Sequence, residues 1–89
     1  MKNEETDAFF DAVLSLKTKE DCYRFFEDIC TINELFSITQ RLEVAKMLKE
    51  GKTFSTIAAK TGASTATIAR VNKCIRYGTG GYNLVLGDK

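Results

Sequence analysis

The side chains best suited to recognition chemistry fall between residues 64 and 76, where hydroxyl, methyl and guanidinium groups recur on one side of an expected helix. At ~100° per residue, the branched Ile68, Val71 and Ile75 mark the inward face. Short outward side chains let a helix enter the major groove of DNA, where hydroxyl and guanidinium groups hydrogen-bond to base edges. The outward and flanking residues with this potential are Ser64, Thr65, Ala66, Thr67, Ala69, Arg70, Lys73 and Arg76.

A second group of polar residues precedes this helix and suits phosphate oxygens rather than bases. No acidic residue occurs between Thr53 and Tyr77, so the whole stretch is attractive to a polyanion. For each lysine alone, a solvated basic surface is the alternative, but the set in this register favours DNA. The expected phosphate-binding residues are Lys52, Ser55, Thr56 and Lys60.

The spacing of apolar and glycine residues over 54–77 predicts a helix-turn-helix. Gly62 follows the small Ala58 by four residues, and glycine supplies the positive φ that such a turn requires. The inward Ile68 and Val71 then follow the glycine at helical spacing. A plain α-hairpin is the alternative, but it does not require all these positions to agree. Ile57 and the small Ala63 complete the expected contact between the two helices.

The composition excludes several kinds of chemistry. There is no histidine, and Cys22, Cys30 and Cys74 are odd in number and lack CxxC spacing, so we expect no metal, no disulfide framework and no enzyme. We expect these cysteines to be buried, reduced thiols. The glycines of 78–81 lack the strand and the GK[ST] step of a phosphate loop.

Eighty-nine residues, 44% of them apolar and 28% charged, are expected to form one domain, 1–89. No apolar run reaches the roughly 20 residues of a membrane span, and the acidic N-terminus does not resemble a signal peptide, so a cytoplasmic protein is expected. Formal charge is −5 over residues 1–40 and +6 over residues 41–89. This split indicates an acidic scaffold and a basic half that meets a polyanion, unless the halves only neutralise each other.

The elements that must position these residues are predicted to be helices, since the chain has no proline. An amphipathic pattern covers 5–16, and Thr18 is expected to cap a second helix.

Two further capping patterns follow in the central part of the chain. Thr31 with Glu34 predicts a short third helix, and Ser37 with Gln40 predicts the start of a fourth that ends at Gly51. The inner face of that fourth helix is expected to hold Ile38, Leu42, Ala45 and Leu48.

Two aromatic pairs predict a partner chain. Phe9-Phe10 and Phe25-Phe26 are adjacent in helices, so each pair points in two directions and leaves ring surface uncovered. We expect a second copy to cover it in a symmetric homodimer formed by the N-terminal helices. An unusually aromatic monomer core is the alternative.

The stretch from about 37 to 82 resembles the Trp repressor family, and its short YerC/YecD-type members most closely. The resemblance rests on RLEVAKMLKEGKTFSTIAAKTGASTATIARVNKCIRYGTGGY, including the RYGTGGY ending. It implies an all-α, intertwined helical homodimer whose helix-turn-helix units bind palindromic operators. The implied layout is dimerisation helices in 1–36, a core helix and the helix-turn-helix in 37–77, and a glycine-containing tail in 78–89.

The resemblance also raises the question of an effector. In the tryptophan-binding members, two arginines enclose the corepressor, and the matching residues are Arg41 and Arg70. A guanidinium can pair with a carboxylate, so an amino-acid effector such as L-tryptophan is chemically conceivable. However, Val71 and Cys74 stand where those members have glycine and serine. We therefore expect no cofactor, with Arg41 in structural or phosphate contacts.

Together these patterns predict a homodimeric, sequence-specific transcriptional regulator, a repressor, that binds double-stranded DNA. The alternative is a helical protein-interaction module without sequence-specific DNA binding.

Overall fold

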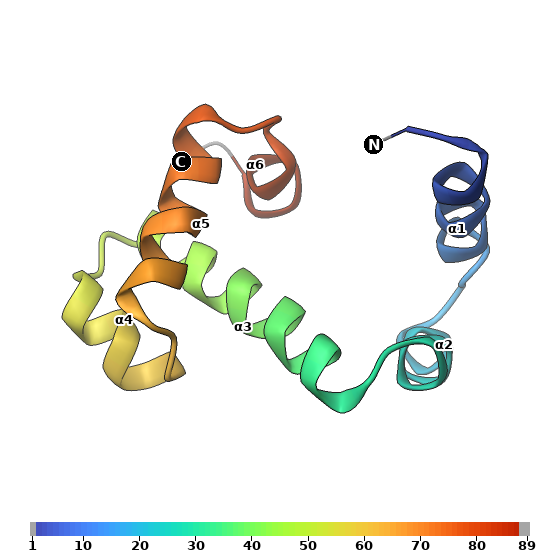
Figure 1. Cartoon of the computed structure of the whole chain (residues 1–89), viewed down its shortest axis with the longest axis horizontal. Helices are drawn as coiled ribbons and strands as arrows, with labels where there is room; N and C mark the ends of the chain where they lie inside the picture. Colours follow the sequence, from blue (N-terminus) through green and yellow to red (C-terminus); the bar gives the residue numbers. More distant parts are fainter. Residues whose placement is uncertain (1, 88–89) are drawn as a thin grey trace. The chain divides into compact units, whose positions relative to one another are not determined.

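The computed structural model describes residues 2–87, and every regular element among them is an α-helix (Figure 1). The predicted all-α class is confirmed, and the last two residues of the predicted tail lie outside the described part. The chain divides into two compact units, Met1–Leu35 and Phe36–Lys89. In chain order the helices are α1 (Glu4–Leu14), α2 (Lys19–Ile29), α3 (Ile32–Lys49), α4 (Phe54–Thr61), α5 (Thr65–Tyr77) and α6 (Gly81–Leu86).

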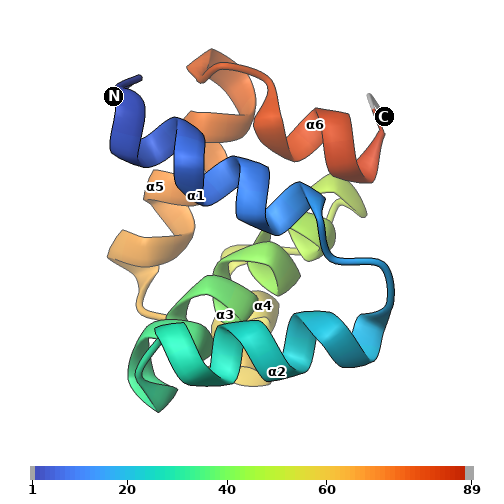
Figure 2. The same ribbon diagram turned by 90° about the vertical axis from the view of Figure 1, so that its right-hand side faces the viewer.

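The first unit contains α1 and α2, which Figure 2 shows as separate helices joined by an irregular segment. The predicted cap of the second helix is confirmed, since the Asp21 backbone N–H donates to Thr18 Oγ1 at 3.0 Å. Ring centroids of neighbouring phenylalanines lie 5.4 to 6.3 Å apart. Even so, neither helix contains a buried residue. The aromatic cluster consists of Phe9, Phe10, Phe25 and Phe26.

The capping box at the start of α3 is confirmed. The Thr31 N–H donates to Glu34 Oε1 at 2.8 Å, and the Glu34 N–H donates to Thr31 Oγ1 at 3.1 Å. The bond from the Thr31 N–H to the Glu34 carboxylate, with a smaller contribution from the Thr31 side chain, favours the ionised form and lowers the pKa of Glu34.

The predicted break between a third and a fourth helix is wrong. Residues 32–49 form one helix of 18 residues, because neither glycine nor proline interrupts it and nothing stops propagation past Ser37. The Gln40 side chain does not return to Ser37 but bonds to Thr61. The helix stops before Gly51, whose φ of +83° confirms the predicted left-handed C-terminal residue.

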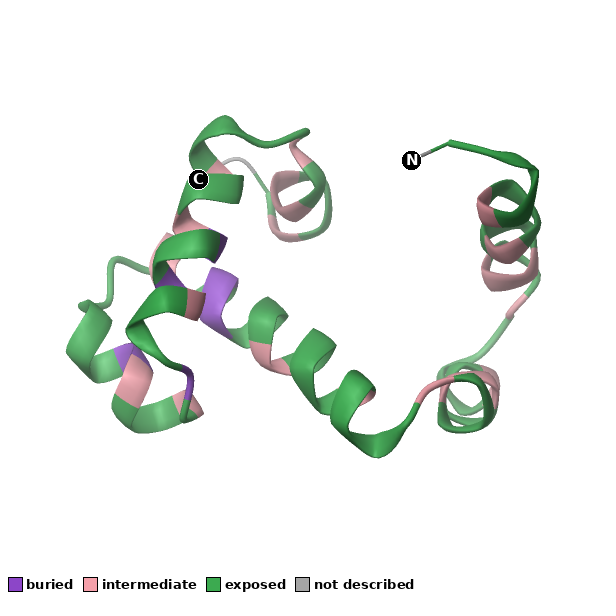
Figure 3. Ribbon diagram, viewed as in Figure 1, coloured by how far each residue is buried: buried purple, intermediate pink, exposed green. Residues whose placement is uncertain are grey.

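The second unit holds the buried core, which joins α3, α4, α5 and the turn before α5 (Figure 3). From the predicted inner face of α3, Ala45 is fully buried and Leu48 partly buried. Ile38 and Leu42 remain 45% and 42% exposed, so their predicted burial within one chain is wrong. The buried residues of α3 all lie between 44 and 47, and both Ile38 and Leu42 come before this segment. The buried residues are Val44, Ala45, Met47, Ile57, Ala63, Ile68 and Val71.

One other expectation needs correction. The cysteines are free, but Cys22 and Cys74 are exposed and Cys30 is half-buried. Helix α2, which contains Cys22 and ends just before Cys30, has no buried residue, and Cys74 lies outside the buried face of α5. The apolar end of the chain forms a further short helix, α6, after Gly80 adopts a φ of +84°. Its Tyr82 and Leu86 pack against the core of the same chain.

Candidate nucleic-acid interface

Helices α4 and α5 form the predicted helix-turn-helix. Gly62 closes α4 with a φ of +75°, and its N–H donates to the Ala58 carbonyl at 2.9 Å. The predicted inward residues Ile57, Ala63, Ile68 and Val71 are all buried. The positive φ and this apolar contact together confirm the motif that the spacing predicted.

A small hydrogen-bond network fixes the turn. Thr61 Oγ1 donates to the Ile57 carbonyl at 2.7 Å and accepts the Ala63 N–H at 3.1 Å. The Thr61 carbonyl accepts Gln40 Nε2 from α3 at 3.0 Å. Spacing identified Gly62 but not Thr61, and it assigned Gln40 to a cap with Ser37, since a contact between residues 21 positions apart forms no local pattern.

The outward surface of α5 is exposed, as the periodicity predicted, with one exception. Ser64 caps the helix, because its Oγ accepts the Thr67 N–H at 3.1 Å. Thr67 is half-buried, and its Oγ1 accepts a second bond from the Ser64 hydroxyl at 3.1 Å. The Thr67 hydroxyl therefore has a partner within the chain before any ligand arrives. The exposed members of the predicted set are Ser64, Thr65, Ala66, Ala69, Arg70, Lys73 and Arg76.

The predicted phosphate-binding residues of the preceding segment are also exposed: Lys52, Ser55, Thr56 and Lys60. Thr53 caps α4 and organises the hydroxyl groups around it. Its Oγ1 donates to Thr56 Oγ1 at 2.9 Å and lies 3.2 Å from Ser55 Oγ. Hydroxyl and backbone N–H donors at the start of a helix, beside a lysine, suit contacts to phosphate oxygens.

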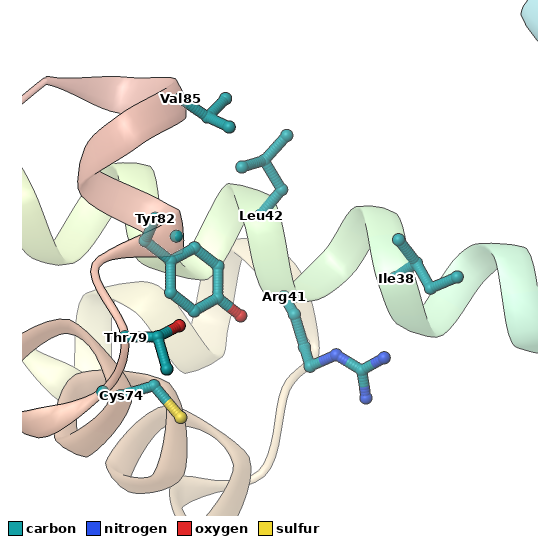
Figure 4. A pocket seen from close by; sticks show the side chains of 9 residues that line it. Ile38, Arg41, Leu42, Cys74, Thr79, Tyr82 and Val85 are labelled. Atoms are coloured by element: carbon teal, nitrogen blue, oxygen red, sulfur yellow. The ribbon is translucent and has the colours of Figure 1, made fainter. Parts of the chain in front are cut away.

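An apolar groove of about 610 Å³ lies between α3, the end of α5 and α6 (Figure 4). Arg41 lines it together with Cys74, but Arg70 does not, so the groove contains only one of the two arginines considered for an effector. Val71 points into the core and is 1% exposed. The other lining residues are Ile38, Leu42, Gly78, Thr79, Gly81, Tyr82 and Val85.

Within residues 2–87, no group of three or more histidine, cysteine or carboxylate side chains is placed to hold a metal ion. The same residues contain no helix that combines the length and apolarity needed to cross a bilayer.

The fold and this surface define the class: an all-α helix-turn-helix protein with a basic and hydroxyl-bearing second helix. A family model for the Trp repressor protein matches residues 4–89. The chain belongs to the Trp repressor family, as the resemblance implied, and that family consists of regulatory DNA-binding proteins.

Individual relatives agree with this membership. The chain is 55% identical over 86 residues to the uncharacterised protein YerC of Bacillus subtilis (strain 168), a match that covers 97% of this chain and 83% of that protein. A TrpR-like protein from Eubacterium eligens ATCC 27750 has the same fold, with a TM-score of 0.92 and 56% identity over 94% of this chain and 87% of that one. A candidate Trp repressor from Staphylococcus aureus also has this fold, with a TM-score of 0.92 and 48% identity. That match covers 96% of this chain and 85% of the other.

Proposed function

We propose that the protein is a cytoplasmic, homodimeric repressor of transcription that binds a palindromic operator by placing each α5 in a major groove. The observation that carries this proposal is the exposed, acid-free surface of α5 on a helix-turn-helix whose turn is fixed by Gly62 and Thr61. Thr65, Ala66, Thr67 and Arg70 would select the sequence. The phosphate contacts that set affinity would come from Lys52, Ser55, Thr56, Lys60, Ser64, Lys73 and Arg76.

The state of the first unit supports the homodimer. Helices α1 and α2 have no buried residue, although their apolar side chains include Phe10 at 54% exposure and Leu14 at 81%. Apolar surface of this kind is stable in water only when something covers it. A second copy is the natural partner, because a two-fold axis also supplies the second α5 that a palindrome requires.

Selection of binding duplexes from a random pool tests the function directly. We expect enrichment of a palindrome whose half-sites lie about one helical turn apart, with affinity that falls as salt rises. A pool without an enriched sequence and without salt-dependent binding would instead favour the protein-interaction module.

Replacing Lys73 by Ala separates affinity from sequence choice. Lys73 is exposed on α5 and carries no base-specific geometry, so its loss should weaken binding to all sequences alike. The slope of log affinity against log salt should decrease by about one unit per chain. Titrations at several salt concentrations, on the selected operator and on an unrelated duplex, measure both effects. A loss confined to the operator would contradict a phosphate role.

We also propose that L-tryptophan is not a corepressor. Where the tryptophan-binding members have glycine, the chain has Val71, and its side chain fills the core. Arg70 is exposed on α5 and stands apart from the groove that Arg41 lines. Calorimetric titration with L-tryptophan should give no saturable heat at micromolar concentration. A micromolar site would contradict this, and the double variant Arg41→Ala, Arg70→Ala would then locate it.

A further inference from the structure

We propose that Gln40 is a positioning residue that sets how the helix-turn-helix sits on α3, and thereby the half-site spacing that the homodimer accepts. This inference rests on the proposed function, because spacing has a meaning only for a dimer that reads two half-sites.

The first observation is the reach of the Gln40 hydrogen bond. Among the side-chain hydrogen bonds of residues 2–87, only two join residues more than four positions apart. One links Lys49 to Asn83 on α6, and the other links Gln40 to Thr61, the last residue of α4. Within the described residues, the Gln40 bond is therefore the one long-range side-chain hydrogen bond between α3 and the helix-turn-helix.

The second observation is what Gln40 satisfies. The last carbonyls of an α-helix lack partners within the helix, and the partly buried Thr61 carbonyl is one of them. Thr61 also holds the turn through its hydroxyl, which accepts the N–H of the buried Ala63. The Gln40 side chain of α3 thus hydrogen-bonds to Thr61, the residue that shapes the turn. A shift of Gln40 would therefore move the turn and α5 together.

The third observation is the packing around this bond. Phe36, Thr39 and Glu43 of α3, with Lys60 of α4, line a hollow of about 210 Å³ beside Gln40 and Thr61. The buried residues of α3 all lie at 44–47, nearer the other end of the helix. The Gln40 hydrogen bond therefore holds the junction at a point of α3 that lies outside the segment with buried side chains.

The consequence concerns DNA geometry. Helix α3 leads into the helix-turn-helix from the segment that we assign to dimerisation, so in the proposed dimer the angle at Gln40 would affect the distance between the two copies of α5. Neighbouring base pairs are about 3.4 Å apart along the duplex, so a change of that size in the distance between the two copies of α5 corresponds to one base pair of spacing. A fixed angle makes a dimer selective for one spacing, and a loose angle lets it accept several.

The test is a panel of palindromes that share the selected half-site but differ in spacing by single base pairs. Gln40→Met keeps the length of the side chain and removes its donor. Thr39→Ala is the matched control, since Thr39 bonds only to the Phe36 carbonyl of its own helix. Dissociation constants on each duplex, and on a single half-site, give the spacing preference independently of overall affinity. Thermal melts report stability separately.

We expect the wild type and Thr39→Ala to prefer one spacing. Gln40→Met should lose about fivefold or more of that preference, as expected for one hydrogen bond per chain, and should retain its half-site affinity. Wild-type ratios in Gln40→Met, or an equal loss on every duplex and on the half-site, would reduce Gln40 to a structural role and overturn the proposal. A wild-type protein that selects no palindrome would contradict the proposed function itself, and this inference with it.

Discussion

Replacing Ala69 by Glu is expected to lower operator affinity by roughly 100-fold, with little effect on folding. Ala69 is exposed on α5, between the residues expected to read bases and those expected to bind phosphate. A carboxylate there meets phosphates of the same charge, and a loss of about 1.4 kcal/mol at each of the two half-sites adds to about 2.8 kcal/mol, or roughly 100-fold. The substitution also places Glu four residues before Lys73, an arrangement that stabilises a helix while it engages the lysine.

Fluorescence anisotropy on the selected palindrome measures this loss at fixed salt. Asn33→Glu is the control, because it adds the same charge at an exposed position in the first turn of α3, where a carboxylate is favourable. Both variants should melt close to the wild type. If Ala69→Glu bound its operator as tightly as the Asn33 variant, the outer face of α5 would not contact DNA.

The helix-turn-helix was predictable from the sequence because its determinants are local. Gly62, the small residues beside it and the branched Ile68 and Val71 all act within about 15 residues of one another, and the structure places each as expected. The caps at Thr18 and Thr31 were predictable for the same reason.

The incorrect predictions have one physical origin: the role of a side chain depends on the residue it contacts, and a contact distant in sequence leaves no local pattern. Ser37 and Gln40 have the form of a capping box, but inside a continuous helix the glutamine bonds to Thr61 instead. Ile38 and Leu42 have the spacing of a buried face, yet they precede the segment of α3 that packs into the core, and both remain exposed within one chain. Periodicity identifies which face is apolar and does not identify what covers it.

Replacing Phe10 by Glu is expected to convert the proposed homodimer into single chains and to abolish tight operator binding. Phe10 belongs to the aromatic cluster and is 54% exposed within one chain, so the substitution is tolerable in a monomer. At a dimer interface, the same carboxylate would lose its hydration without gaining a partner, at a cost of several kcal/mol. Because the dimer is symmetric, this cost arises once in each chain. Operator affinity should fall with the mass, because one α5 alone engages only half of the palindrome.

Sedimentation equilibrium at micromolar concentration measures the mass, and anisotropy on the same samples measures operator binding. Ala8→Glu is the matched control on α1, because Ala8 is exposed and lies on the polar face with Glu4 and Asp11, where another carboxylate costs only a few tenths of a kcal/mol. The control should keep the mass and affinity of the wild type. A wild-type protein that sediments as a single 9.9 kDa chain would contradict the proposed homodimer. The exposed apolar faces of α1 and α2 would then need a different partner. A Phe10→Glu variant that keeps the mass of two chains would place the dimer contact elsewhere, because no stable interface leaves a buried carboxylate unpaired.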